Sequence, residues 1–196
     1  MDCWSCGAER GDALFCTTCK ILQPESKKED WFAALGVEKK FSIDTKALAK
    51  AFRTRSVKVH PDRFAQKSAV ERRLAVQHTA KLNDAYRTLS DPHKRAEYLM
   101  KLEGVEIGGE EQRTNDPEFL MAMMELQEEA DGAKTAGAID AMLERVEGIR
   151  TGELDKVRAY FDDGVGERAQ IVRALDALRY YMRLVERLTA RREEAS

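Results

Sequence analysis

The chain has 196 residues, of which 35% are charged, and its formal net charge is −2. This length suits one or two domains, and the near-balanced charge offers no footprint for nucleic-acid binding. No apolar run approaches the roughly 20 residues that a membrane span needs, and Met1-Asp2-Cys3 leaves no room for a leader peptide before the first cysteine. We therefore expect a cytoplasmic protein that binds neither membrane nor nucleic acid.

The four cysteines form two Cys-x2-Cys pairs separated by nine residues: Cys3, Cys6, Cys16 and Cys19. Two residues between cysteines let both thiolates face one ion, and two such knuckles complete a closed tetrahedral site. Residues 1–22 are too few to bury a core, so metal binding would supply their folding energy. We predict one structural zinc ion, with rubredoxin-like iron, a dithiol redox site and disulfides as the alternatives.

Residues 23–29 form a short polar linker, and the next strong pattern runs from Thr45 to Val59. Leu48, Phe52 and Val59 recur there at helical spacing. Basic residues occupy other positions of the same stretch: Lys46, Lys50, Arg53, Arg55 and Lys58. This pattern predicts a helix with one buried stripe and one cationic face.

The tripeptide His60-Pro61-Asp62 follows this helix directly. Pro61 disfavours the helical conformation of His60, so the helix is expected to end there. A second apolar-periodic run extends from Val70 to Leu89. The tripeptide therefore lies in the turn between two antiparallel helices. The Asp62 carboxylate can accept charge-assisted hydrogen bonds from an arginine of a partner, while Pro61 fixes the turn.

The C-terminal part has the pattern of three antiparallel helices. After a loop over residues 103–116, Asn115 or Asp116 is a candidate N-cap, and Pro117 opens a helix limited by Gly132. A second helix fits Thr135 to about Ile149, and a long third one runs from about Glu153 or Gly164 to Arg191. We predict an all-α bundle over residues 117–196, with no strand outside the metal module.

The helix that opens at Pro117 has more apolar residues than one buried stripe requires: Phe119, Leu120, Met121, Met123, Met124 and Leu126. Such a helix is either fully buried or offers a second face to a partner, and methionine suits both uses. Charge also divides the chain, because residues 103–131 hold ten acids and one base, whereas residues 46–63 hold six bases and one acid. Two faces of opposite sign suggest two different partners.

These motifs resemble those of HscB-type J-domain co-chaperones of iron–sulfur cluster assembly. The matching stretches are 30–37, 59–64, 82–92 and 95–99. The resemblance implies a J domain over residues 30–102 and a client-binding bundle over 117–196. It also supports zinc, because some members, notably mitochondrial ones, carry a similar four-cysteine module.

The resemblance further implies two partners. An HscA-type heat-shock ATPase would be stimulated through six residues: His60, Pro61, Asp62, Arg53, Lys58 and Arg63. An IscU-type scaffold protein would bind a second set of six: Leu120, Met121, Met124, Glu125, Glu128 and Tyr180. One acid of the family pattern falls at Gly132 here, which removes part of the polar rim.

With no nucleophile–base constellation in the sequence, we interpret the chain as a non-enzyme. The nearest alternative is a general J-domain co-chaperone with other clients. A zinc-ribbon protein that binds nucleic acid is a further alternative. It is disfavoured because residues 1–20 contain only Arg10 and Lys20 as bases, whereas phosphate binding needs clustered positive charge.

Overall fold

The computed structural model describes residues 2–9, 14–26, 29–105, 107 and 117–194. The chain forms two compact units, Met1–Asp91 and Pro92–Ser196, which we describe separately. Within the described ranges there is no strand; two isolated antiparallel bridges, Asp2 with Glu9 and Phe15 with Leu22, lie in the cysteine-containing segment. No helix in the described part of the chain combines the length and apolarity needed to cross a bilayer. The all-α prediction is confirmed.

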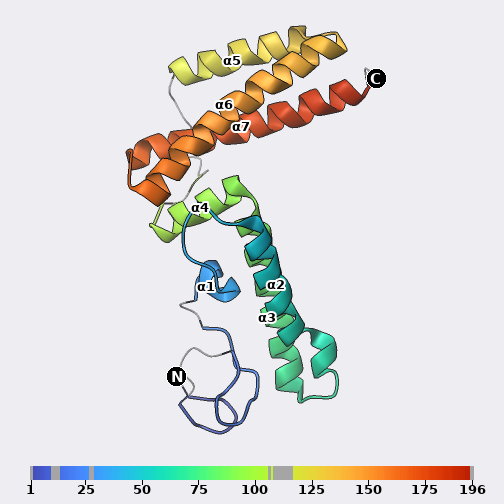
Figure 1. Ribbon diagram of the computed structural model, residues 1–196, viewed down its shortest axis with the longest axis vertical. Coiled ribbons are helices and arrows are strands. Elements are labelled where there is room, and N and C mark those ends of the chain that lie inside the picture. The colour runs from blue at the N-terminus through green and yellow to red at the C-terminus, as the bar shows by residue number, and fades with distance from the viewer. Residues whose placement is uncertain (1, 10–13, 27–28, 106, 108–116, 195–196) are drawn as a thin grey trace. The chain divides into compact units, whose positions relative to one another are not determined.

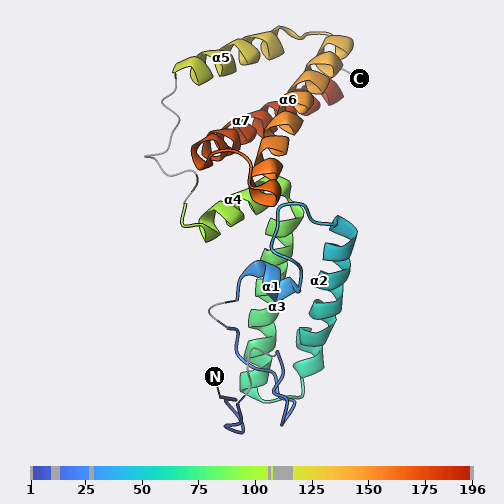
Figure 2. The ribbon, with the colours of Figure 1, turned by 60° about the vertical axis from the view of Figure 1, so that its left-hand side comes forward.

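Unit 1 is built on a helical hairpin. It contains α1 (Trp31–Leu35), α2 (Thr45–Val59), the 3-10 turn η1 (Pro61–Phe64) and α3 (Ala69–Ser90). Helices α2 and α3 lie side by side, with α1 packed against them (Figures 1 and 2). As predicted, the His60 tripeptide occupies the turn that follows α2.

Each helix of unit 1 begins at a side chain that accepts hydrogen bonds from the first helical turn. Asp30 caps α1, Asp44 caps α2, and Ser68 caps α3. On α3 the Glu71 carboxylate also reaches back to the Ser68 N–H at 3.2 Å, which completes a capping box. A cap of this kind contributes about 1 kcal/mol to helix stability. Local sequence therefore defines where the hairpin helices begin.

The core of unit 1 lies between the three helices. Its buried side chains include Phe32, Leu35, Leu48, Val59, Phe64, Leu74, Leu82 and Leu89. Phe52 and Tyr86 stack across the hairpin, with ring centroids 4.4 Å apart. The stripes predicted from helical spacing thus pack against each other, which leaves the remaining faces of α2 and α3 to solvent.

Unit 2 contains α4 (Pro92–Leu102), α5 (Pro117–Gly132), α6 (Ala136–Asp163) and α7 (Arg168–Glu194). Helices α6 and α7 lie side by side (Figures 1 and 2). A core of buried apolar side chains joins them to α5. Helix α4 packs against α7 and α6. The predicted three-helix bundle over α5, α6 and α7 is confirmed.

Helix α6 is longer than the sequence pattern indicates. We expected it to end near Ile149, with Glu153 as one possible start of the next helix, but α6 continues to Asp163. The helix includes Gly148 and Gly152, and each glycine costs only about 1 kcal/mol relative to alanine. That cost is too small to break a helix whose apolar residues on both sides are buried. Gly164, with a φ of 69°, ends α6.

Two other expectations concern the start and the end of α5. The helix ends at Gly132, as predicted. The candidate N-caps Asn115 and Asp116, and most of the 103–116 loop, lie outside the described residues.

Candidate functional site

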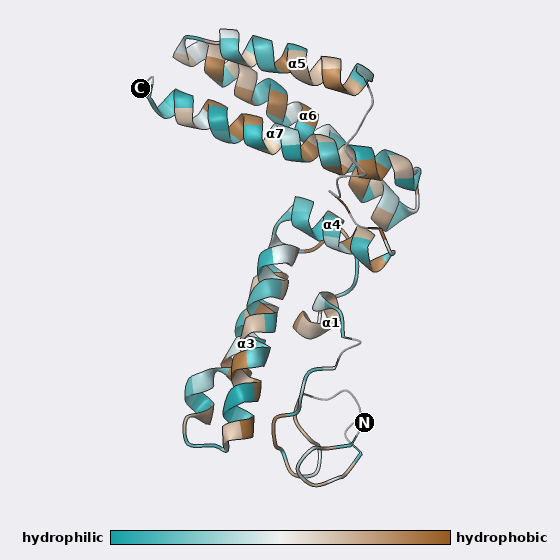
Figure 3. Ribbon diagram, turned by 180° about the vertical axis from the view of Figure 1, so that it is seen from behind, coloured by the Kyte–Doolittle hydropathy of each residue, from teal (hydrophilic) through white to brown (hydrophobic). Residues whose placement is uncertain are grey.

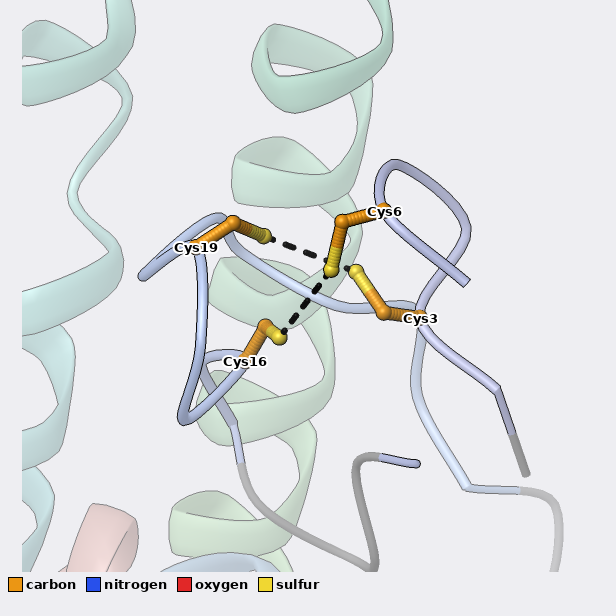
Figure 4. A group of neighbouring side chains, drawn as sticks. All are labelled: Cys3, Cys6, Cys16 and Cys19. Atoms are coloured by element: carbon orange, nitrogen blue, oxygen red, sulfur yellow. Dashed lines mark hydrogen bonds between the residues drawn. The ribbon is translucent and has the colours of Figure 1, made fainter. Parts of the chain in front are cut away.

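The four cysteine sulfurs converge between two loops (Figure 4). Cys3 Sγ lies 3.6 Å from Cys19 Sγ, and Cys6 Sγ lies 3.8 Å from Cys16 Sγ. All four sulfurs lie within 4.8 Å of one another. A tetrahedral ion with metal–sulfur bonds of about 2.3 Å requires sulfur separations of about 3.8 Å, whereas a disulfide requires about 2 Å. The four residues therefore fit a metal ion.

The two knuckles share one backbone pattern. The N–H of Gly7 donates to the Cys3 carbonyl at 3.0 Å, and the N–H of Lys20 donates to the Cys16 carbonyl at 2.9 Å. Both donors have positive φ, 71° at Gly7 and 59° at Lys20. Glycine adopts this conformation without a steric cost, whereas lysine carries a penalty of about 1 kcal/mol. Gly7 is therefore the residue type that suits such a turn, whereas Lys20 is not.

The surroundings shift the pKa values of the Cys3 and Cys19 thiols in opposite directions. Burial raises the pKa of the Cys3 thiol, but hydrogen bonds from the N–H groups of Cys6 and Ser5 outweigh it and lower the pKa to about 6. At Cys19 the N–H of Ile21 lowers the pKa, but burial and the neighbouring sulfurs raise it to about 12. Four adjacent thiolates repel one another, so a divalent cation is the group that would allow all four to be deprotonated.

Sequence reasoning missed Gln23, which it assigned to the polar linker. The Gln23 side chain is fully buried, and its Nε2 donates to Cys3 Sγ at 3.3 Å and to the Ile21 carbonyl at 2.8 Å. Donors of this kind orient the residues that bind a metal. The Trp4 indole donates to the Leu22 carbonyl at 2.8 Å and so ties the first knuckle to the chain after the second. The apolar pair Ile21-Leu22 was the available signal that the module continues to this point.

The His60 tripeptide is presented at the surface of unit 1. The side chains of His60 and Asp62 are 55% and 90% exposed. His60 Nδ1 accepts a hydrogen bond from the Asp62 N–H at 3.4 Å, which closes the turn between α2 and η1. Pro61 is the first residue of η1, where its fixed φ suits the turn. The Asp62 carboxylate is therefore held at the surface, available to a cationic partner.

Basic residues occur on both sides of the tripeptide in the sequence, on α2 and in η1. Arg53, Lys58 and Arg63 are exposed, as expected for residues that meet a partner. Arg55 differs, because its Nη1 donates to the Ala34 carbonyl at 2.7 Å. Arg55 therefore contributes to the packing of α1 on α2 rather than to the exposed cationic face.

Helix α5 is apolar on two faces. The face that packs into the bundle core contains Met123, Leu126 and Ala130. The opposite face, which we call the α5 outer face, consists of Leu120, Met121, Met124, Glu125 and Glu128. Its three apolar side chains are 49%, 62% and 63% exposed, and apolar residues extend over the first half of the helix (Figure 3). The outer-face positions repeat every three to four residues, so they form one continuous strip.

Tyr180 on α7 lies beside α5 rather than on its outer face. Its hydroxyl is 2.7 Å from the Met123 carbonyl and 3.1 Å from Gln127 Oε1. Burial raises the pKa of the phenol, and the ring packs against the bundle core. Tyr180 therefore holds α5 in place, and its described contacts are with residues outside the strip.

Two histidines, His78 on α3 and His93 on α4, are buried and lie within hydrogen-bond distance of main-chain carbonyls. His78 Nε2 lies 2.7 Å from the Gln23 carbonyl, and His93 Nε2 lies 3.0 Å from the Leu175 carbonyl. Their acceptors are 55 and 82 residues away in the chain, and nothing in the local pattern indicates them.

Known proteins share both units. Residues 30–98 match the DnaJ domain, and residues 115–189 match the HSCB C-terminal oligomerisation domain. The iron–sulfur cluster co-chaperone protein HscB of Mus musculus is 32% identical over 190 residues, which are 95% of this chain and 80% of that protein. The chain belongs to the HscB co-chaperone family.

Other HscB proteins agree with this assignment. The co-chaperone protein HscB homolog of Paraburkholderia phymatum is 36% identical over 84% of this chain and 93% of its own length. The crystal structure of human co-chaperone protein HscB matches with a TM-score of 0.88 and 29% identity, over 97% of this chain and 98% of that one. The resemblance inferred from the sequence motifs is confirmed at the level of the HscB family. The roles of individual residues remain predictions.

Proposed function

We propose that this HscB-family protein brings an IscU-type iron–sulfur scaffold to an HscA-type heat-shock ATPase and stimulates ATP hydrolysis by that ATPase. The supporting observation is the distribution of two exposed surfaces between two compact units. The His60 tripeptide belongs to unit 1, and the α5 outer face belongs to unit 2. A protein that connects a client to an ATPase needs two such surfaces, one for each partner.

The ATPase contact is proposed to work through Asp62. Its carboxylate is 90% exposed and can form a charge-assisted hydrogen bond with an arginine of the ATPase. Arg53, Lys58 and Arg63 are exposed nearby in sequence and would steer the encounter with an acidic surface. The chain itself performs no bond-breaking chemistry in this scheme.

The scaffold contact is proposed to centre on Leu120, Met121 and Met124. Unbranched methionine side chains adapt to the surface that they meet, and the exposed carboxylates of Glu125 and Glu128 would form a polar rim. Gly132 is exposed and has open space around it. It adds no charge where the family pattern has an acid, so the rim is shorter here.

Zinc is the metal that we propose for the four cysteines. When bound, the ion would cross-link the two knuckles and stabilise a segment too small to fold alone. The protein, purified without added metal, is expected to contain about one equivalent of zinc by elemental analysis. A red preparation that contains iron would contradict the assignment.

Single-turnover ATP hydrolysis by an HscA-type ATPase tests the role of the tripeptide. Asp62→Asn and His60→Gln are expected to abolish the stimulation while far-UV circular dichroism stays unchanged. Asp84→Asn is the matched control, because Asp84 is an exposed carboxylate on α3 whose described ion pair is with neighbouring Arg87. Full stimulation by both tripeptide variants would remove the proposed contact.

Calorimetric titration of an IscU-type scaffold tests the α5 outer face. We expect the triple variant Leu120→Ala, Met121→Ala, Met124→Ala to lose binding. Val165→Ala, whose side chain is equally exposed at 62%, should bind like the wild type. A wild-type protein that stimulates the ATPase but does not bind the scaffold would instead be a general J-domain co-chaperone.

A further inference from the structure

Gln23 joins the cysteine cluster to the hairpin of unit 1. Its side-chain Nε2 donates to Cys3 Sγ at 3.3 Å, and its main-chain carbonyl is 2.7 Å from Nε2 of His78 on α3. Gln23 is fully buried, and His78 is 7% exposed. Since a carbonyl only accepts, His78 Nε2 must carry the proton. One buried residue therefore contacts both a candidate metal-binding sulfur and the interior of the hairpin.

The next residue on α3 extends this set of contacts to the tripeptide. The Thr79 hydroxyl lies 3.4 Å from the carbonyl of Val59 and 2.8 Å from that of Ala75. Val59 is fully buried and is the last residue of α2, directly before His60. Two consecutive residues of α3 therefore make these contacts: His78 binds the Gln23 carbonyl, and Thr79 contacts the end of α2 directly before the tripeptide.

A partly open pocket lies beside this link. Its volume is about 380 Å³, and its walls include Leu14, Pro24, Val59, His78 and Leu82 together with the charged residues Glu29, Arg55 and Lys81. The Gln23–His78 contact therefore borders a part of the interface that side chains do not fill.

We propose that Gln23 and His78 couple the metal site to the J-domain hairpin, so that metal binding and the ordered end of α2 stabilise each other. This inference rests on the proposed metal site. When the metal is lost, Cys3 is freed to move, and Gln23 loses the sulfur that holds its side chain. The carbonyl that His78 binds then loses its fixed position, and the end of α2 loosens. Coupling between two sites is reciprocal, so a change at His78 must also alter metal affinity.

Zinc affinity of the full-length protein, measured by competition with a chromophoric chelator, tests the coupling. Gln23→Leu removes the donor to Cys3 and is expected to weaken zinc binding about 10- to 100-fold. His78→Leu touches no cysteine, yet it is expected to weaken zinc binding at least about fivefold. His78→Gln retains a donor near the position of Nε2, so it should restore affinity to within about twofold of the wild type.

Two controls separate the link from general destabilisation. His93→Leu removes the equivalent buried contact from unit 2, to the Leu175 carbonyl, and should leave zinc affinity unchanged. Leu89→Ala destabilises α3 at a fully buried position and should also leave it unchanged in the folded protein. An equal loss of affinity in Leu89→Ala would overturn the specific role of Gln23 and His78.

Hydrogen exchange tests the reverse direction of the coupling. Removal of zinc by a chelator is expected to speed amide exchange at the end of α2 and in η1 of the wild-type protein. Gln23→Leu should show this faster exchange even with zinc bound. Normal zinc affinity in folded His78→Leu would overturn the coupling alone, whereas a wild-type protein that binds no zinc would overturn the metal site and the coupling together.

Discussion

Gly36 combines two requirements at one position of unit 1. Its φ of 69° ends α1, and a side chain there would overlap the guanidinium of Arg55. That guanidinium is held by the Ala34 carbonyl at 2.7 Å. Gly36→Ala is expected to lower the free energy of unfolding by about 2 kcal/mol, which is the sum of a left-handed backbone penalty and a weakened hydrogen bond. Urea denaturation followed by circular dichroism measures this loss.

A double-mutant cycle separates the two terms. In an Arg55→Ala background the overlap disappears, so Gly36→Ala should cost only the backbone term of about 1 kcal/mol. An unchanged cost in that background would show that Arg55 yields freely and that the left-handed conformation alone requires glycine.

Lys20 is the strained counterpart of Gly7 in the second knuckle. Its φ is 59°, and relief of about 1 kcal/mol of strain corresponds to about fivefold in affinity. We therefore expect Lys20→Gly to raise zinc affinity about fivefold in chelator competition. Lys39→Gly, at an exposed lysine outside the metal module, serves as the control and should have no effect. A fall in affinity would mean that the contact of the Lys20 ammonium with the Thr17 carbonyl, at 2.6 Å, outweighs the strain.

Individual site residues could be predicted from the sequence where the chemistry requires one residue type, as metal binding requires cysteine thiolates here. Cys-x2-Cys spacing predicts the cluster of four cysteines. Gln23 could not be found in this way, because its partners are a sulfur 20 residues away and a histidine 55 residues away. A long-range contact between polar residues leaves no periodic signal in the sequence.

At the scale of elements, α5 provides a direct comparison of two leucines on one helix. Leu126 is 5% exposed and Leu120 is 49% exposed. Leu126→Ala should destabilise unit 2 by about 2 to 5 kcal/mol, whereas Leu120→Ala should change stability by less than about 0.5 kcal/mol. Thermal unfolding distinguishes the two. Equal losses would mean that the outer face is packed in solution.

Tyr180 tests how α5 is fixed to α7. Tyr180→Phe removes the hydroxyl that contacts the Met123 carbonyl and Gln127, at a cost of about 1 kcal/mol. Amide exchange in α5 is therefore expected to accelerate while the ring packing remains. Tyr160→Phe, which loses a hydroxyl contact with Glu103, is the control and should leave α5 unchanged. Unchanged exchange in Tyr180→Phe would leave the ring as the main contact.

The helices themselves were largely predictable, because apolar spacing and end signals agree. Helix α5 ends at Gly132, and the hairpin helices follow their stripes. The full length of α6 was not predictable, because Gly148 and Gly152 weaken the local helical signal. The helix continues through them because Val146 and Val157, on either side, are buried. Tertiary packing overrides propensity where the propensity cost is near 1 kcal/mol.

At the scale of the whole molecule, charge and apolarity are divided between two proposed contacts. The residues around the tripeptide are basic, whereas the α5 outer face is apolar with an acidic rim. Raising the salt from 0.1 to 1 M shortens the Debye length from about 10 to 3 Å, so association with the ATPase should slow markedly. Scaffold binding should change less and should show a negative heat-capacity change.

Stopped-flow kinetics and calorimetry at the two salt concentrations check this difference. Equal salt dependence of both contacts would argue against separate electrostatic and apolar recognition.

The family and the helical architecture could be inferred from motifs that stand close together in the sequence. The set of contacts from the cysteines to the end of α2 could not, because it is assembled by packing.

Both tryptophans of the chain, Trp4 and Trp31, lie in unit 1. The Trp4 indole is 39% exposed and bonds to the Leu22 carbonyl inside the metal module, whereas Trp31 opens α1. Their emission therefore comes from the half of the protein that contains the cysteines, with no tryptophan background from the other half. Replacing either one with phenylalanine would assign the signal to the module or to the hairpin. The protein thus carries an intrinsic optical probe for metal exchange, usable without any attached dye.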